Sequence, residues 1–165
     1  MKPGTLTKEE KSAELKKYRD LLIAALDYWL LSEDMHIQPE DYNSRDHFNN
    51  LKRQTEEHFS KGRLTILKQW FRDLTERHLE TQDFRFNKYL QDRTGYEIDI
   101  FKSYFDRIEK IVANGKITTD NQFYDVTIMV DQLCQTEPVD DNKMSILNEL
   151  LSDYEQRKSR KIRAN

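Results

Sequence analysis

The chain has 165 residues, of which 36% are hydrophobic and 35% are charged, and its formal net charge is −3 at pH 7. This length suffices for about one domain with one core, and the large charged fraction leaves little material for strands buried on both faces. Four glycines and three prolines are too few for a turn-rich β protein, and the two tryptophans, eight tyrosines and eight phenylalanines argue against disorder. We therefore predict an all-α fold, a single-domain bundle of six to seven helices over residues 1–165.

Cysteine usage and hydropathy bear on the compartment. The single cysteine, Cys134, excludes an intrachain disulfide and a cysteine-built zinc site, and on an apolar stripe it is expected to be buried. The first residues run into charged ones without an apolar signal region. The longest stretch without Asp, Glu, Lys or Arg is six residues, 21–26, which is too short to span a membrane. The sequence therefore predicts a cytoplasmic protein with no membrane contact.

The first helix is predicted from a capping pair, because Thr7 and Glu10 have the spacing of a capping box. A stripe with the helical period follows. Because Asp27 is the only charge in residues 21–31, we expect this helix to be buried nearly all round and to be central. Residues 33–43 are predicted to be a loop. The stripe consists of Leu15, Tyr18, Leu22, Leu26 and Trp29.

The middle of the chain predicts three further helices. Ser44 is expected to cap the second helix, and Gly62 is expected to end it. A third helix covers residues 64–78, a break follows at 81–83, and a short aromatic helix covers 84–93. The inward stripes of the second and third helices are Phe48, Leu51, Thr55, Phe59, Leu64, Leu67, Trp70, Phe71, Leu74 and His78.

The last third predicts three more helices. Asn114-Gly115 should end the first of them, Thr119 or Asp120 should cap the second, and Asp140 should cap the third. Their stripes are Phe101, Tyr104, Phe105, Ile108, Ile111 and Val112; Phe123, Val126, Val130, Leu133 and Cys134; and Met144, Leu147, Leu151 and Tyr154. Across the whole chain, the core is predicted to include Leu22, Leu26, Trp29, Phe71, Phe101, Phe105, Ile108, Val130 and Leu147.

No motif points to catalysis or to a cofactor. No two glycines lie close enough to form a phosphate-binding loop. The histidines His36, His47, His58 and His78 are not spaced three or four residues apart, as ligands on one helix would be. We therefore predict no enzyme, no metal and no cofactor.

One alternative is an enzyme or a ligand-binding bundle whose site is assembled from distant residues. Asp27, His58 and His78 are the candidates, since each falls on or near an apolar stripe. The competing interpretation is structural: a core histidine is expected to be hydrogen-bonded, and Asp27 is expected to pair with a nearby Arg, Lys or Tyr. A deep polar cavity lined by all three residues would favour the site.

The favoured function rests on charge asymmetry. Residues 117–156 carry nine acids against one lysine, Lys143, whereas residues 157–163 carry five basic residues and no acid. An acidic surface of this kind indicates a basic partner. We therefore expect a non-catalytic protein-binding module of the immunity or inhibitor type. Its predicted partner-binding residues are Asp120, Asp125, Asp131, Glu137, Asp140, Asp141, Glu149 and Asp153.

The remaining alternative is a nucleic-acid-associated or regulatory helical protein. Residues 84–107 interleave aromatic and basic residues, which is typical of surfaces that stack bases and hold phosphates. The basic tail 157–165, left open as either ordered or disordered, could contact a backbone without sequence preference. The acidic net charge and the inward position of most of these aromatics favour the protein-binding function instead.

Overall fold

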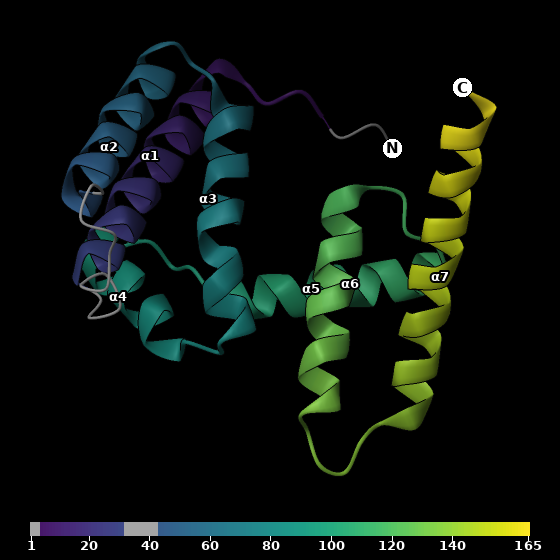
Figure 1. Ribbon diagram of the computed structural model, residues 1–165. Coiled ribbons are helices and arrows are strands. Elements are labelled where there is room, and N and C mark those ends of the chain that lie inside the picture. Colours follow the sequence, from purple (N-terminus) through teal and green to yellow (C-terminus); the bar gives the residue numbers. More distant parts are fainter. Residues whose placement is uncertain (1–3, 32–42) are drawn as a thin grey trace. The chain divides into compact units, whose positions relative to one another are not determined.

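The computed structural model describes residues 4–31 and 43–165, and helices are the only regular elements in these ranges (Figure 1). The all-α prediction is confirmed: helices account for 81% of the described residues, which hold no strand. No helix in the described ranges is long and apolar enough to cross a bilayer. The elements are α1 (Lys8–Leu31), α2 (Ser44–Ser60), α3 (Leu64–Glu80), α4 (Phe84–Thr94), α5 (Ile100–Asn114), α6 (Asp120–Cys134) and α7 (Asp141–Ala164).

The chain divides into two compact units, Met1–Ile98 and Asp99–Asn165. The first unit contains α1 to α4 and the second contains α5 to α7. That residues 1–165 fold as one domain stays a prediction.

Helix α1 is the centre of the first unit, as predicted, because it packs against α2, α3 and α4. Its start is the predicted capping box: the Thr7 amide donates to Glu10 Oε2 at 2.7 Å, and the Glu10 amide donates to Thr7 Oγ1 at 3.2 Å. The middle of the helix, residues 21–26, is enclosed on nearly every side, with only Ile23 half-buried. A stretch so poor in charge can be central because all its faces meet apolar neighbours.

The ends of α2, α3 and α4 follow the local sequence with one correction. The cap of α2 is Asn43 and not Ser44: Asn43 Oδ1 accepts a hydrogen bond from the Asp46 amide at 3.2 Å. Asn and Ser both cap helices well, so the sequence alone did not show which of these two neighbouring residues is the cap. Gly62 follows the end of α2 with φ of 65°, and the turn at 81–83 separates α3 from α4. Of the predicted loop 33–43, residues 33–42 lie outside the described residues.

In the second unit, helix α6 packs against both α5 and α7. All three helices begin at a side-chain cap, since oxygens of Asp99, Thr119 and Asp140 accept from amides in the first turn. This confirms Thr119 and Asp140 as caps. Helix α7 continues to Ala164, so residues 157–164 of the basic tail are helical.

The predicted core is mostly present. Trp29 and Val130 are half-buried, and Phe105 is 49% exposed, so the prediction that Phe105 is buried was wrong. On α5 the buried residues centre near Tyr104, and Phe105 lies roughly 90° around the helix from that centre. The core residues that are buried as predicted are Leu22, Leu26, Phe71, Phe101, Ile108 and Leu147.

The face of α6 that is buried differs from the face that was predicted to be buried. Its buried residues are Asp125, Val126, Ile128 and Met129, whose centre lies roughly 100° from that of the stripe through Val130. Cys134 is consequently exposed, and its predicted burial was wrong. Asp125 had been predicted to face solvent with the other acids, and a lone carboxylate is indeed costly to bury.

Candidate functional site

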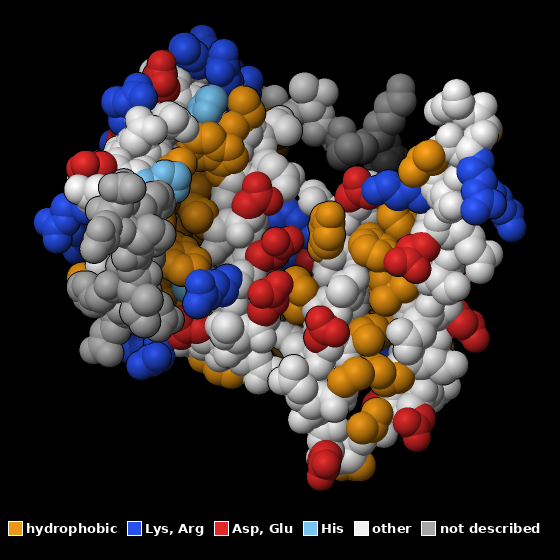
Figure 2. Space-filling model, in the orientation of Figure 1, with side chains coloured by type: hydrophobic (Ala, Val, Ile, Leu, Met, Phe, Trp, Pro, Cys, Tyr) orange, Lys and Arg blue, Asp and Glu red, His pale blue; other side chains and the backbone are white. Residues whose placement is uncertain are grey.

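Seven of the eight predicted partner-binding acids are exposed, all in the second unit. Figure 2 shows acidic side chains beside a line of hydrophobic side chains along the seam between α6 and α7. The exposed acids are Asp120, Asp131, Glu137, Asp140, Asp141, Glu149 and Asp153.

Asp125 is the exception, and its assignment to the binding surface was wrong. It is 1% exposed, and its carboxylate accepts hydrogen bonds from Arg107 Nε at 2.8 Å and from Nη2 at 3.3 Å. The Tyr104 hydroxyl donates to the Asp125 carbonyl at 2.8 Å. Burial and the Asp125 charge raise the pKa of Tyr104. Asp125 therefore holds α5 and α6 together rather than facing a partner.

Two of the exposed acids are already paired within the chain. Asp120 Oδ1 accepts from Lys158 Nζ at 2.7 Å and from the Tyr154 hydroxyl at 2.6 Å, and these hydrogen bonds lower the pKa of Asp120. Asp153 Oδ2 accepts from Arg157 Nε at 2.9 Å. Part of the basic segment thus neutralises acids that the sequence had assigned to a partner.

Five exposed acids remain on the hairpin formed by the end of α6, the turn after it and the first half of α7. We call Asp131, Glu137, Asp140, Asp141 and Glu149 the hairpin surface. The lysine of this stretch, Lys143, lies 3.8 Å from Glu109 on α5. Val139 and Ile146 are 42% and 39% exposed in the same stretch. The hairpin surface therefore combines exposed apolar side chains with carboxylates that have no basic side-chain partner in the part of the chain that the structure describes.

The three residues proposed for an assembled site do not line one cavity. Asp27 forms an ion pair with Lys52 and lies 3.9 Å from Arg93, which matches the structural partner expected from sequence. His58 packs edge-on against Trp70 at 4.9 Å between ring centroids. His78 lines a cleft whose lining includes neither Asp27 nor His58. In residues 4–31 and 43–165, no three His, Cys, Asp or Glu side chains are arranged to hold a metal; His36 lies outside these ranges.

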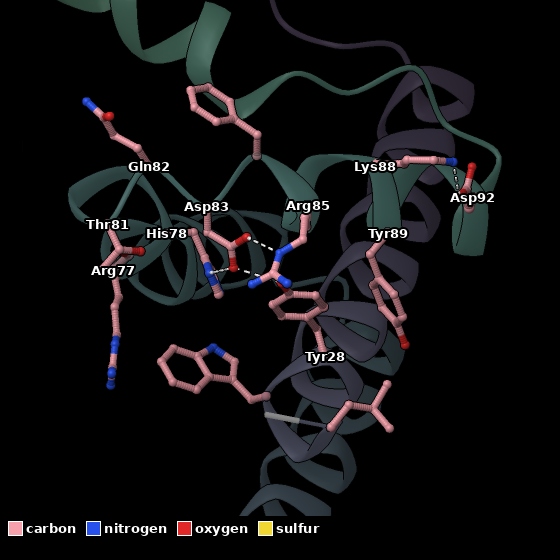
Figure 3. A pocket seen from close by; sticks show the side chains of 13 residues that line it. Tyr28, Arg77, His78, Thr81, Gln82, Asp83, Arg85, Lys88, Tyr89 and Asp92 are labelled. Carbon is pink, nitrogen blue, oxygen red and sulfur yellow. Dashed lines mark hydrogen bonds and ion pairs between the residues drawn. The ribbon is translucent and has the colours of Figure 1, made fainter. Parts of the chain in front are cut away.

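That cleft, of about 1100 Å³, lies in the first unit (Figure 3). Its walls come from the end of α1, the end of α3, the turn 81–83 and α4. We call it the aromatic cleft, and it is lined by Tyr28, Trp29, Leu31, Arg77, His78, Thr81, Gln82, Asp83, Phe84, Arg85, Lys88, Tyr89 and Asp92.

Asp83 joins the parts of the aromatic cleft. Its Oδ2 accepts from the Tyr28 hydroxyl at 2.7 Å and lies 3.3 Å from His78 Nδ1, while Arg85 Nε lies 3.9 Å from Oδ1. Desolvation opposes ionisation of Asp83, but the Tyr28 hydrogen bond and the His78 ring outweigh it and lower its pKa. Burial and the bond to Asp83 raise the pKa of Tyr28 to about 12. The Asp83 charge is therefore satisfied from within the protein.

His78 sits in an aromatic enclosure, which explains its burial. It stacks on Phe86 at 3.8 Å with the planes 10° apart, and the rings of Tyr28 and Trp29 lie 5.3 and 5.2 Å away. Desolvation lowers the pKa of His78 despite the opposing charge of Asp83. We therefore treat it as a neutral ring.

The His78–Asp83 pair has the form of a general base held by a carboxylate, but it is enclosed. A base must reach the proton that it takes. His78 Nε2 has neither solvent access nor a hydrogen-bond partner among the described residues. The Nε1 atom of the neighbouring Trp29 is likewise buried without such a partner. The two atoms are complementary, because neutral His78 donates through Nδ1 and keeps a lone pair at Nε2. This arrangement favours a structural histidine.

The aromatic and basic segment 84–107 is divided by the fold. Phe86, Phe101 and Tyr104 are buried in helix interfaces, whereas Phe84 and Arg85 line the aromatic cleft. The sequence signal thus located one wall of the cleft. It could not supply the wall from α1, whose Tyr28 lies 55 positions before Asp83.

No family model, no curated protein and no solved structure matches this chain.

Proposed function

We propose that this protein is a non-catalytic binding module that holds a basic protein partner on the hairpin surface, as an immunity or inhibitor-type protein would. The observation that carries the proposal is the set of five exposed acids on the hairpin that α6, the following turn and α7 form, together with exposed Val139 and Ile146. We place this function in the cytoplasm, which fits the free thiol of Cys134.

The acidic excess of the hairpin surface remains when the acids that are paired within the chain are set aside. Asp120, Asp125 and Asp153 have basic partners within the chain, so they offer a cationic protein little. The hairpin surface has only Lys143 among its acids, and Lys143 is directed toward Glu109. Crowded carboxylates repel one another, and a basic partner would relieve that repulsion and speed its own association.

Apolar side chains supply the second element of a binding surface. Figure 2 shows a line of hydrophobic side chains along the seam between α6 and α7. The predicted inward stripes of these two helices include residues that are only half-buried, namely Val130, Leu133, Met144 and Leu151. Binding surfaces commonly place such a centre inside a polar rim, and the centre contributes most of the affinity. The seam and the acids around it have this composition.

Capture from a lysate of the native host tests the proposal. The wild-type chain on a resin is expected to retain a protein of basic pI, which elutes as salt is raised because exposed charges are screened. Asp131→Lys with Glu137→Lys should abolish retention. Glu80→Lys with Glu97→Lys, exposed acids of the first unit, makes the same change in net charge and should preserve it. Retention that both variants keep, or both lose, would contradict the assignment to the hairpin surface.

A further inference from the structure

The C-terminal part of α7 carries a second charged surface, which the proposed function does not use. Arg157 Nη2 donates to the Ile117 carbonyl at 2.7 Å, and Lys158 Nζ lies 2.7 Å from Asp120, the first residue of α6. Residues 159–164 continue the helix beyond these contacts, and all of them are exposed. Figure 1 shows this end of α7 reaching past α6. This end of the helix is therefore open to solvent on every face.

We call Arg160, Lys161, Ile162 and Arg163 the basic end. Its three cations form no ion pair with the described residues, and Ile162 is 70% exposed. The helix dipole favours cations at this position, and a single exposed isoleucine is ordinary on a protein surface. The inference comes instead from a counterpart of opposite charge on the same unit.

That counterpart is the hairpin surface. Its acids have no basic side-chain partner among the described residues, and Val139 and Ile146 are exposed in the same stretch. The basic end has the opposite charge and an exposed aliphatic side chain of its own. Interfaces combine apolar contact with complementary charge, so the two surfaces suit each other.

The two surfaces cannot meet within one copy. Asp141 is the first residue of α7, and Arg163 lies near the other end of the same 24-residue helix. A rise of about 1.5 Å per residue places them about 33 Å apart, whereas exposed charges are screened within about 8 Å. Figure 2 shows basic side chains toward one end of α7 and acidic side chains toward the turn at its other end. Each surface is therefore left for a molecule outside its own copy.

We propose that the basic end of one copy docks on the hairpin surface of a second copy, head to tail. The proposal rests on the proposed function, because it uses the same acids as a binding surface. A phosphate backbone is a poorer occupant of the basic end, since it would leave Ile162 without a contact and would be repelled by a unit in which acids outnumber bases. Because the two surfaces that meet are different, the contact continues into chains or closes into a ring.

Sedimentation equilibrium of the full chain tests the contact. At low salt the average mass of the wild type should rise with concentration, and added salt should lower it. Arg160→Glu with Arg163→Glu should weaken self-association at least about tenfold, and so should Asp131→Lys with Glu137→Lys. Lys8→Glu with Lys11→Glu, exposed lysines of α1, changes the net charge as much as the first variant and should associate as the wild type does.

A mixture of the two charge-reversed variants gives the sharpest test. Each variant alone would bring like charges together, whereas the mixture pairs opposite charges at every contact. The mixture should therefore regain the mass that each variant loses, which also shows that both are folded. A wild type that stays monomeric at low salt, a reversed variant that associates as the wild type does, or a mixture that stays monomeric would overturn the proposal.

Capture from the host lysate separates this contact from the proposed function. The variant Arg160→Glu with Arg163→Glu keeps the hairpin acids, so it should still retain a protein of basic pI. A monomeric wild type that captures such a protein would reject the head-to-tail contact alone. Self-association without a captured basic protein would support the contact and reject the foreign partner.

Discussion

Asp125 and Arg107 form an ion pair that removes Asp125 from the predicted binding surface. The carboxylate is enclosed between α5 and α6, whereas 37% of the Arg107 side chain reaches solvent. A buried charge persists only where it is paired and hydrogen-bonded, and this one is. The pair links residues 18 positions apart, so no local pattern in the sequence announces it.

Loss of Arg107 should be costly because it leaves a buried charge alone. We expect Arg107→Met to lower the free energy of unfolding by about 2–3 kcal/mol, the lower side of the usual range since Arg107 is partly solvated. Adding Asp125→Asn should recover part of the loss, because the buried group is then neutral. Urea denaturation of the single and double variants measures both effects. A double variant less stable than Arg107→Met would count against this account of the pair.

His78 makes stability depend on pH. Because its pKa is lowered in the folded state, the unfolded chain takes up the proton more readily. The contribution of neutral His78 is complete above its ordinary pKa of 6.5 and is lost as pH falls from there toward the folded value. We expect the wild type to lose more stability than His78→Gln between pH 7.5 and pH 5. Urea midpoints at both pH values test this, and identical losses would show that His78 does not titrate as described.

At the scale of the helix, α5 offers a test of which face is buried. Ile108 is enclosed and Phe105 is not, although they are three residues apart on one predicted stripe. Ile108→Ala should cost about 2–5 kcal/mol because it leaves a cavity. Phe105→Ala should cost about 1 kcal/mol or less, as exposed substitutions do. Thermal denaturation of both variants measures the difference. A larger loss of stability from Phe105→Ala than from Ile108→Ala would show that the core lies against the Phe105 face of α5, contrary to this account.

The starts and ends of helices were predictable because their causes are local. Thr7 with Glu10, Thr119 and Asp140 each cap amides within one turn, so the sequence contains the whole interaction. Orientation about the helix axis was harder, since a helix with two neighbours buries more than one face. On α6 the neighbour that matters for Asp125 is Arg107 of another helix, and periodicity cannot report it.

In the two candidate sites too, features that depend on nearby residues were predictable, and contacts between distant residues were not. The acids near the turn between α6 and α7 were located by charge counting, but their pairing was not, since Asp120 meets Lys158 38 positions away. For the aromatic cleft, segment 84–107 indicated one wall. Trp29 had been predicted only as a core residue of the first helix, and only packing brings it to His78 and the neighbouring Tyr28 to Asp83.

At the scale of the whole molecule, the two units raise the question of cooperativity. Both tryptophans, Trp29 and Trp70, belong to the first unit, whereas far-UV circular dichroism reports the helices of both. If residues 1–165 unfold as one domain, the two signals should change together in urea with one midpoint. Tryptophan fluorescence that shifts at a different midpoint would show that the units unfold separately.

The proposed function rests on the charge distribution of the second unit, and kinetics can examine it directly. Long-range attraction between exposed charges is screened within about 8 Å at physiological ionic strength. Association driven by the hairpin surface must therefore slow as salt rises, while the dissociation rate changes less.

The decisive measurement is the association rate with the captured basic partner, recorded from low to high salt. We predict a rate that falls steeply with salt for the wild type, and a rate at least about tenfold lower at low salt for Asp131→Lys with Glu137→Lys, with helical content unchanged. Glu80→Lys with Glu97→Lys should behave as the wild type. A rate that is independent of salt and equal in all three proteins would show that the hairpin acids are a solubilising coat, and not a binding surface.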